Sequence, residues 1–228
     1  MLRFIKTRSK KACQEKLYLT LTEKLKQNHK VLLIMSGGSN IPILKKVFDK
    51  LPEDLSSNLN LILSDERFGP SDFQESNYNK LIKAGFNKKQ ASFNSILINK
   101  NRKDSVHFLE QQFIKMSKES DSIIAQLGIG QDGHIAGLLP NTKALASTSY
   151  ATGYQGPDFN RISLTFKALK KIDLAIVAAY GPNKKEALEH LNNANLETTI
   201  LPAMILQEIK SIYIYNDQVG SPIKRGKK

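Results

Sequence analysis

Residues 127–140 place an aspartate and a histidine two positions apart, Asp132 and His134, in a stretch rich in glycine. The stretch follows the apolar run Ser122–Leu127, which predicts that it leaves the end of a buried strand. Histidine titrates near neutral pH, and glycine lets the backbone approach a ligand closely. The pair is therefore a candidate acid/base device, and the alternative is a glycine-rich turn with a solvated histidine.

The glycines of this stretch, Gly128, Gly130 and Gly133, match the spacing of a dinucleotide-binding fingerprint, but their context does not. That fingerprint opens a long helix and is followed about 20 positions later by an acidic residue for the ribose. Here Pro140 follows closely, and residues 147–155 contain neither Asp nor Glu. The sequence therefore does not predict a dinucleotide site.

Short apolar runs alternate with helical patterns along the chain. The expected strands are residues 31–35, 60–64, 95–98, 122–127, 161–165, 173–179 and 211–215, and the expected helices are residues 11–27, 41–50, 77–84, 103–116 and 184–192. This alternation predicts a doubly wound, modified Rossmann-like α/β fold, with a mostly parallel sheet and helices on both faces. We expect one domain over residues 1–228, with residues 147–160 forming a long loop or lid.

Four of the expected strands end in loops of unusual composition. These loops are Ser36–Asn40, Asp65–Pro70, the segment that holds Asp132 and His134, and Tyr180–Lys184. The carboxyl ends of parallel strands lie along one edge of the sheet, where open α/β folds bind their ligands. The four loops are therefore expected to converge on one site.

The first of these loops contains the small residues Ser36, Gly37, Gly38 and Ser39 directly before an expected helix. Backbone amides at the positive end of a helix dipole form an anion site. The loop lacks the Gly-Lys-Ser/Thr of a P-loop, so a nucleotide is not implied. The alternative is that Ser39 or Asn40 simply caps the helix.

Two cations near these loops are candidate ligands for an anion. Arg67 lies in the charged triplet Asp65–Arg67, and such triplets usually form surface clusters. Arg67 is nevertheless one of only six arginines in a lysine-rich chain, and its planar fork suits a carboxylate or phosphate. Lys184 stands at the expected start of a helix, where a cation opposes the dipole, and this favours a bound anion there.

The net charge of +13 is carried mostly by lysines spread along the chain. Denser basic groups occur only near the ends, at residues 3–11 and 224–228, where they are expected to be solvated. No nucleic-acid recognition motif accompanies the charge, so no nucleic-acid partner is expected. A positive field would instead attract small anionic molecules.

Cys13 is the only cysteine, which excludes an internal disulfide and argues against a cysteine-based zinc site. We expect it to serve as a small apolar side chain on the first helix. No apolar run approaches the roughly 20 residues needed to span a bilayer, and the start of the chain is too charged for a secretory signal. The expected protein is cytoplasmic and has no membrane partner.

Five ordered blocks of residues lie between Val31 and Leu188. They are Ser36–Ser39, Asp65–Arg67 with Ser76–Tyr78 after it, Gly128–Ala136, Arg161–Thr165 and Gly181–Lys184. Their order and spacing resemble the 6-phosphogluconolactonase family. The resemblance implies hydrolysis of 6-phospho-D-glucono-1,5-lactone to 6-phosphogluconate in the oxidative pentose phosphate pathway. It implies a small-molecule sugar-phosphate substrate and neither a metal nor an organic cofactor.

The resemblance also implies roles for the residues of these blocks. His134 would act as general base for a water, with Asp132 holding its ring or loop, and Arg67 would steady negative charge or bind a sugar hydroxyl. The remaining implied substrate-binding residues are Ser36, Gly37, Gly38, Ser39, Asp65, Gly130, Arg161 and Lys184. Of these, the Ser36–Ser39 backbone, Arg161 and Lys184 would hold the phosphate.

Two alternatives remain beside the lactonase. Glucosamine-6-phosphate deaminases share this family's fold, but they carry a glutamate just before the proline that ends the Asp-Gly-His loop and a tyrosine after the Asp-Glu pair. Leu139 and Arg67 stand at these places here, which favours the lactonase. A non-catalytic sugar-phosphate-binding protein is disfavoured because Asp132 and His134 are both present.

The chain also departs from the usual lactonase pattern beside the site. Asn40-Ile41 replaces the usual Thr-Pro, and Gly137–Leu139 replaces Ser-Leu-Phe. These departures leave the substrate preference open, and the sequence leaves open whether the protein is a monomer or a homodimer.

Overall fold

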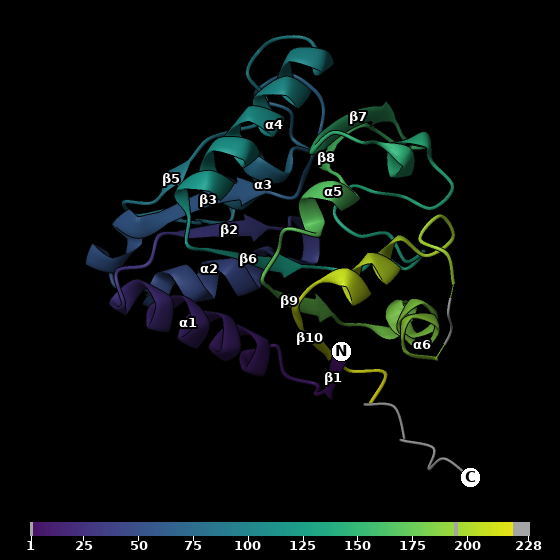
Figure 1. Cartoon of the computed structure of the whole chain (residues 1–228), viewed down its shortest axis with the longest axis horizontal. Helices are drawn as coiled ribbons and strands as arrows, with labels where there is room; N and C mark the ends of the chain where they lie inside the picture. Colours follow the sequence, from purple (N-terminus) through teal and green to yellow (C-terminus); the bar gives the residue numbers. More distant parts are fainter. Residues whose placement is uncertain (1, 194–195, 221–228) are drawn as a thin grey trace.

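The described residues form a central sheet of seven parallel strands, in the order β1-β10-β9-β6-β2-β3-β5 (Figure 1). The structure, a computed structural model, describes residues 2–193 and 196–220. The strands of this sheet are β1 (Leu2–Lys6), β2 (Val31–Met35), β3 (Leu59–Leu63), β5 (Ser92–Phe93), β6 (Ser122–Leu127), β9 (Leu174–Ala179) and β10 (Ser211–Asn216). Every neighbouring pair is parallel, so the carboxyl ends of the strands lie along one edge.

The order of the strands reverses beside β2. From β2 the chain continues to β3 and β5 in one direction, whereas β6 lies on the other side of β2 and leads to β9 and β10. Open parallel sheets bind ligands at the carboxyl edge next to such a reversal. The loops that follow β2 and β6 therefore flank the place where this fold favours a site.

Helices cover both faces of the central sheet. They are α1 (Lys11–Lys26), α2 (Ile41–Lys50), α3 (Asn77–Lys83), α4 (Arg102–Glu119), α5 (Phe166–Leu169) and α6 (Lys185–Asn193), with short 3-10 helices at Gly38–Asn40, Asp54–Asn58, Lys143–Ala146, Pro182–Lys184 and Pro202–Glu208. Figure 1 shows α1 and α2 on one side of the sheet and α4 on the other. The predicted doubly wound, mostly parallel α/β fold is confirmed.

The sequences of the elements explain this layering. The β2 strand reads Val-Leu-Leu-Ile-Met, and all five of its side chains are buried, as expected for a parallel strand covered on both faces. Helix α2 is amphipathic, with Leu44, Val47 and Phe48 on its buried side. Pro42 lies in its first turn, where the missing N–H breaks no helical hydrogen bond.

Three antiparallel strands form a smaller second sheet. They are β4 (Asp65–Arg67), β7 (Ala151–Gln155) and β8 (Asn160–Leu164), in the order β4-β8-β7. The prediction of a long loop or lid over residues 147–160 is therefore wrong, because much of this segment belongs to the β7–β8 hairpin. Threonine and tyrosine favour strands, and the polar composition that suggested a loop belongs to a strand with a partly exposed face.

Two other strand predictions are corrected by the structure. Residues 95–98 are not a strand; Ser92–Phe93 is the edge strand, and Ile96 and Leu97 are buried in the loop that follows it. Their apolar character reflects packing rather than strand pairing. The β1 strand was not predicted, because Arg3 and Lys6 interrupt its apolar pattern. Charges of this kind are typical of strands at the edge of a sheet.

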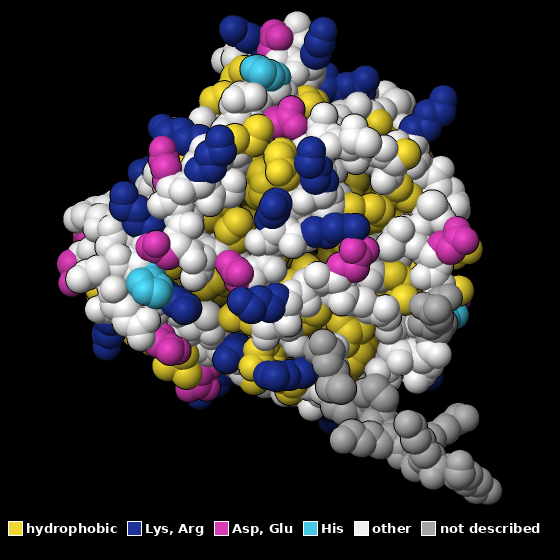
Figure 2. Space-filling view, in the orientation of Figure 1, with side chains coloured by type: hydrophobic (Ala, Val, Ile, Leu, Met, Phe, Trp, Pro, Cys, Tyr) yellow, Lys and Arg dark blue, Asp and Glu magenta, His cyan; other side chains and the backbone are white. Residues whose placement is uncertain are grey.

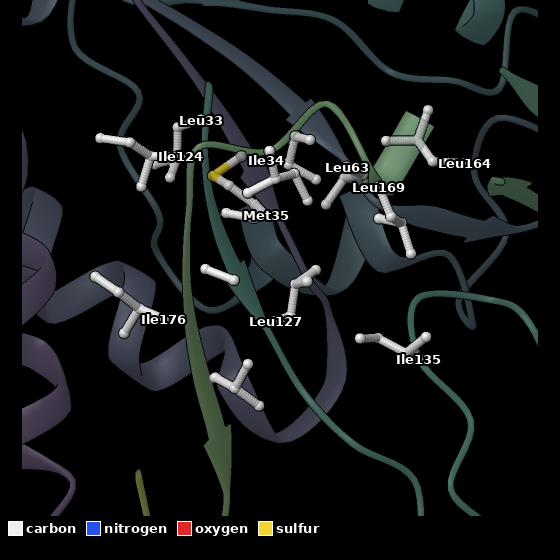
Figure 3. Close-up of a cluster of buried hydrophobic side chains, with 14 of the residues drawn as sticks. Leu33, Ile34, Met35, Leu63, Ile124, Leu127, Ile135, Leu164, Leu169 and Ile176 are labelled. Atoms are coloured by element: carbon white, nitrogen blue, oxygen red, sulfur yellow. The ribbon is translucent and has the colours of Figure 1, made fainter. Parts of the chain in front are cut away.

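The hydrophobic core reaches into the segment that carries the predicted acid/base pair. Figure 3 shows part of this core, with Ile135 directed toward Leu127 at the end of β6. Ile135 is fully buried, although it directly follows His134. The core therefore anchors this segment in the middle of its length.

Charge is dispersed over the surface. On the face shown in Figure 2, lysine and arginine side chains are scattered among aspartate and glutamate side chains. This agrees with the spread of lysines along the sequence. The basic group predicted at residues 224–228 lies outside the described residues.

Cys13 is buried on α1, as predicted. Burial raises the pKa of its thiol to about 12, so the side chain is neutral at physiological pH. No helix within the described part of the chain is long and apolar enough to cross a membrane.

Candidate active site

A polar pocket of about 280 Å³ lies at the carboxyl edge of the central sheet, beside the reversal next to β2. All the predicted site residues except Asp132 line it. The pocket also contains three polar side chains that were not predicted, Asn40, Asn77 and Asp158. A groove of about 430 Å³ between α1 and α2 is larger, but its lining residues all belong to these two helices and to none of the loops that follow the strands.

Asp132 lies behind His134 rather than in the pocket lining. Its Oδ1 is 2.6 Å from Nδ1 of the His134 ring and also accepts the His134 backbone N–H at 3.2 Å. Burial opposes ionisation of Asp132, but the hydrogen bonds and the charge of His134 outweigh it and lower the Asp132 pKa to about 2. An ionised carboxylate only accepts hydrogen bonds, so Nδ1 carries the proton. The Nε2 atom of a neutral His134 ring then holds the free lone pair.

The backbone of this segment is folded tightly around the pair. Gly130 N–H donates to the His134 carbonyl at 2.9 Å, and Ile135 forms isolated bridges with Ile129 and Leu138. A side chain at position 130 has no room, because a Cβ atom there would lie 2.1 Å from His134 Nδ1. Gly130 is therefore required by close approach, and it brings the backbone directly beside the imidazole.

The Ser36–Asn40 loop enters α2 through a 3-10 turn. Asn40 makes no side-chain cap to the helix. Its Nδ2 donates instead to Ser36 Oγ at 3.1 Å, and Ser36 Oγ donates to Gln126 Oε1 at 3.3 Å. The helix-cap alternative is therefore wrong for Asn40. Its side chain instead forms a hydrogen bond within the loop, and Ser36 links the loop to β6.

Strand β4 directs its three charged side chains alternately, as the pleat of a strand requires. Asp65 and Arg67 line the pocket, whereas Glu66 between them is completely buried. The Glu66 carboxylate accepts hydrogen bonds from four donors: the backbone N–H groups of Arg67, Asn77 and Tyr78, and Ser76 Oγ, at 2.6–3.0 Å. Burial nevertheless raises the Glu66 pKa to about 7. This carboxylate fastens β4 to the start of α3.

That attachment positions Asn77, a pocket residue that was not predicted from the sequence. Asn77 Nδ2 donates to the Asp65 carbonyl at 3.0 Å and to Asp65 Oδ2 at 3.2 Å. Its side chain also packs on the phosphate-loop candidate, because a Cβ atom at Gly37 would lie 2.3 Å from Asn77 Oδ1. The Ser76–Tyr78 block was the signal that could have identified Asn77.

The two arginines of the pocket lie directly opposite each other. Arg67 on β4 and Arg161 on β8 form a cross-strand pair in the antiparallel register. Like charges in such a pair destabilise a sheet unless anions accompany them. Each arginine has a carboxylate partner: Arg67 donates to Glu75 Oε2 at 2.9 Å, and Arg161 donates to both oxygens of Asp158 at 2.7 and 2.8 Å.

Lys184 completes the cationic side of the pocket. It ends the 3-10 turn Pro182–Lys184, directly before α6. Burial lowers the Lys184 pKa, and the negative charge of Asp132 partly opposes this effect. Lys184 has no ion-pair partner within residues 2–193 and 196–220. The pocket thus joins a histidine backed by a carboxylate to three cations.

Residues 6–214 match the family model described as glucosamine-6-phosphate isomerases/6-phosphogluconolactonase. A 6-phosphogluconolactonase of Borreliella burgdorferi is 32% identical over 192 residues, covering 78% of this chain and 80% of the relative. One from Helicobacter pylori is 30% identical over 200 residues, covering 82% and 83%. The crystal structure of a Thermotoga maritima 6-phosphogluconolactonase superposes with a TM-score of 0.76 at 22% identity, covering 95% of this chain and 98% of that one.

Proposed function

Because the chain belongs to the glucosamine-6-phosphate isomerase/6-phosphogluconolactonase family, we propose that it hydrolyses 6-phospho-D-glucono-1,5-lactone to 6-phospho-D-gluconate, a step of the oxidative pentose phosphate pathway. One observation carries this proposal: His134, paired with Asp132, lines the same pocket as Arg67, Arg161 and Lys184. A base beside a concentration of positive charge suits the hydrolysis of a phosphorylated ester.

The proposed reaction begins with a water held by His134. Nε2 takes a proton from the water as its oxygen attacks the lactone carbonyl, and negative charge develops on the carbonyl oxygen. The bond from the carbonyl carbon to the ring oxygen then breaks, and the imidazolium returns the proton to that oxygen. Asp132 stabilises the imidazolium and keeps Nε2 toward the pocket, so it acts as a positioning residue.

The cations have separate proposed roles. The phosphate would be bound by Arg161, Lys184 and the backbone of Ser36–Ser39. These groups would donate charge-assisted hydrogen bonds to its oxygens. Arg67 would steady the charge on the carbonyl oxygen or bind a sugar hydroxyl. Asp65, held by Asn77, and the Gly130 backbone would bind the sugar hydroxyls. With the phosphate bound in this way, the lactone ring would lie beside His134.

The deaminase alternative lacks a group that it needs. The segment between His134 and Pro140 supplies no carboxylate, and Leu139 does not line the pocket. Its backbone N–H instead donates to the Tyr154 hydroxyl at 3.3 Å. A binding protein without activity does not require the Asp132–His134 hydrogen bond, which prepares a base. Both alternatives are therefore disfavoured.

We also propose that the whole chain acts as one domain, in the cytoplasm, as a monomer or homodimer. Its partner would be a small-molecule sugar phosphate, without nucleic acid, membrane, metal or organic cofactor. The proposed steps use only protein side chains and water.

A coupled assay tests the function directly. Freshly prepared 6-phosphogluconolactone is supplied, and 6-phosphogluconate formation is followed with 6-phosphogluconate dehydrogenase. The protein should raise the rate well above spontaneous hydrolysis, and no increase with pure protein would contradict the proposal. Glucosamine 6-phosphate, supplied in parallel, should release no ammonia; release at a comparable rate would favour the deaminase.

A further inference from the structure

The turn between β7 and β8, residues 156–159, contacts both arginines of the pocket with consecutive side chains. Asp158 accepts hydrogen bonds from Arg161 Nη2, and the Phe159 ring centre lies 4.8 Å from the guanidinium carbon of Arg67. The Gly156 N–H donates to the Phe159 carbonyl at 2.8 Å and closes the turn. One short turn therefore holds the two cations that face each other across β4 and β8.

Asp158 places a negative charge in the lining of a pocket suited to anions. Arg161 is only 8% exposed, and a buried charge of this kind needs a counter-charge. Burial opposes ionisation of Asp158, but the hydrogen bond and charge of Arg161 outweigh it and lower the Asp158 pKa. Asp158 is therefore ionised at neutral pH and neutralises Arg161 while the pocket holds no other anion.

The ion pair with Asp158 uses only one of the three nitrogens of the Arg161 guanidinium. Both Asp158 oxygens converge on Nη2, while Nε is buried and has no partner among the described residues. A guanidinium binds most strongly when two of its nitrogens bind two oxygens side by side. A phosphate dianion, with more oxygens and more charge than a carboxylate, can satisfy Arg161 better than Asp158 does.

We propose that the Asp158 carboxylate competes with bound anions for Arg161. This competition sets the affinity of the pocket for phosphate and excludes singly charged anions. A carboxylate ligand would only replace one carboxylate by another at Arg161, whereas a phosphate ester gains charge and hydrogen bonds. Asp158 would in this way exclude the carboxylate end of the product from the phosphate position. This inference rests on the proposed function, which supplies the phosphate ester.

The test is Asp158→Asn, which removes the charge but keeps an Oδ1 acceptor for the Phe159 N–H. Titration calorimetry with inorganic phosphate should show binding about three- to tenfold tighter than in the wild type, as expected for an ion pair whose carboxylate is half-exposed. The gain should appear in KM for the phosphorylated lactone rather than in kcat. Excess acetate should weaken phosphate binding in the variant and not in the wild type.

Asp49→Asn is the matched control. Asp49 pairs with Lys45 at 2.8 Å and is as exposed as Asp158, but it lies on α2 outside the pocket. The control should bind phosphate like the wild type. Asp158→Ser, checked for native circular dichroism, serves as a second variant and should also bind phosphate more tightly.

Equal or weaker phosphate binding in folded Asp158→Asn and Asp158→Ser would overturn the inference and make Asp158 a residue that merely orients Arg161. The titration is independent of turnover. Lactonase activity in the wild type, together with unchanged phosphate binding in the variants, would therefore contradict this inference alone. Absence of lactonase activity would contradict the proposed function, while the titration would still decide the role of Asp158.

Discussion

The two walls of the pocket are built in different ways. The wall that holds His134 comes from one continuous segment after β6, and its main contacts join residues 129 to 138. The wall that holds Arg67 and Arg161 comes from β4, β8 and the start of α3, which lie far apart in the sequence. One local segment can thus position an acid/base pair, whereas the surface that would bind a charged ligand depends on the assembly of the second sheet.

Changes to the first wall are expected to affect the chemical step most strongly. His134→Ala should lower kcat about a hundredfold or more, the usual contribution of a positioned general base, and leave KM nearly unchanged. Steady-state kinetics on the purified variant measures this. Turnover like that of the wild type would exclude His134 as the base.

Asp132→Asn separates positioning from chemistry within the same wall. An asparagine amide that donates to Nδ1 places the ring proton on Nε2, which removes the lone pair from the pocket. We expect kcat to fall at least about tenfold, with substrate affinity largely kept. The pKa of Asp132, lowered to about 2, means that the wild-type carboxylate is ionised at neutral pH. An unchanged kcat in the variant would contradict the assigned tautomer.

Changes to the cations proposed to bind the phosphate should affect binding instead. Arg161→Ala in the second wall, and Lys184→Ala in the turn before α6, would each remove a proposed charge-assisted bond to phosphate, worth roughly 1.5–3 kcal/mol, so KM should rise about 10- to 150-fold. The effect on kcat should be small, because the phosphate lies away from the reacting carbonyl. Unphosphorylated gluconolactone is the control substrate. Equal effects of Lys184→Ala on both lactones would remove Lys184 from the phosphate site.

The smallest expected effect concerns the attachment between β4 and α3. Glu66→Gln places an amide among four hydrogen-bond donors and should lower the free energy of unfolding by about 1–3 kcal/mol. The raised Glu66 pKa of about 7 means that its stabilising contribution is full below its unfolded value near 4.5 and declines as the pH rises to about 7. The loss in the variant should therefore be smaller at pH 8 than at pH 5.

Urea denaturation at the two pH values measures this difference. A loss that grows from pH 5 to pH 8 would contradict the raised pKa. Asp54→Asn, an exposed acidic residue of a surface 3-10 helix, is the control and should show little change at either pH.

The contrast between the walls also explains what the sequence could predict. The Asp132–His134 pair and the Ser36–Asn40 loop depend on neighbours in sequence and on a buried strand before them, so their place was predictable. The opposition of Arg67 and Arg161 depends on the register of two strands that pair only in the folded chain. Asp158 was not predicted for another reason: the segment that holds it has the composition of a loop. Sequence patterns report local geometry and burial, but not which distant strands meet.

The burial of Ile135 next to His134 has a consequence for how the protein would respond to heat. The base is fixed to the same packed interior that holds the central sheet, whereas Arg161 is carried on a three-stranded sheet with a partly exposed face. The His134 segment is nevertheless tied to this sheet, because the Gly137 N–H donates to Ser163 Oγ on β8 and the Tyr154 hydroxyl on β7 donates to the Gly137 carbonyl. Loosening of the small sheet on warming would therefore disturb both walls of the pocket, and substrate binding and turnover should fail over the same range of temperature.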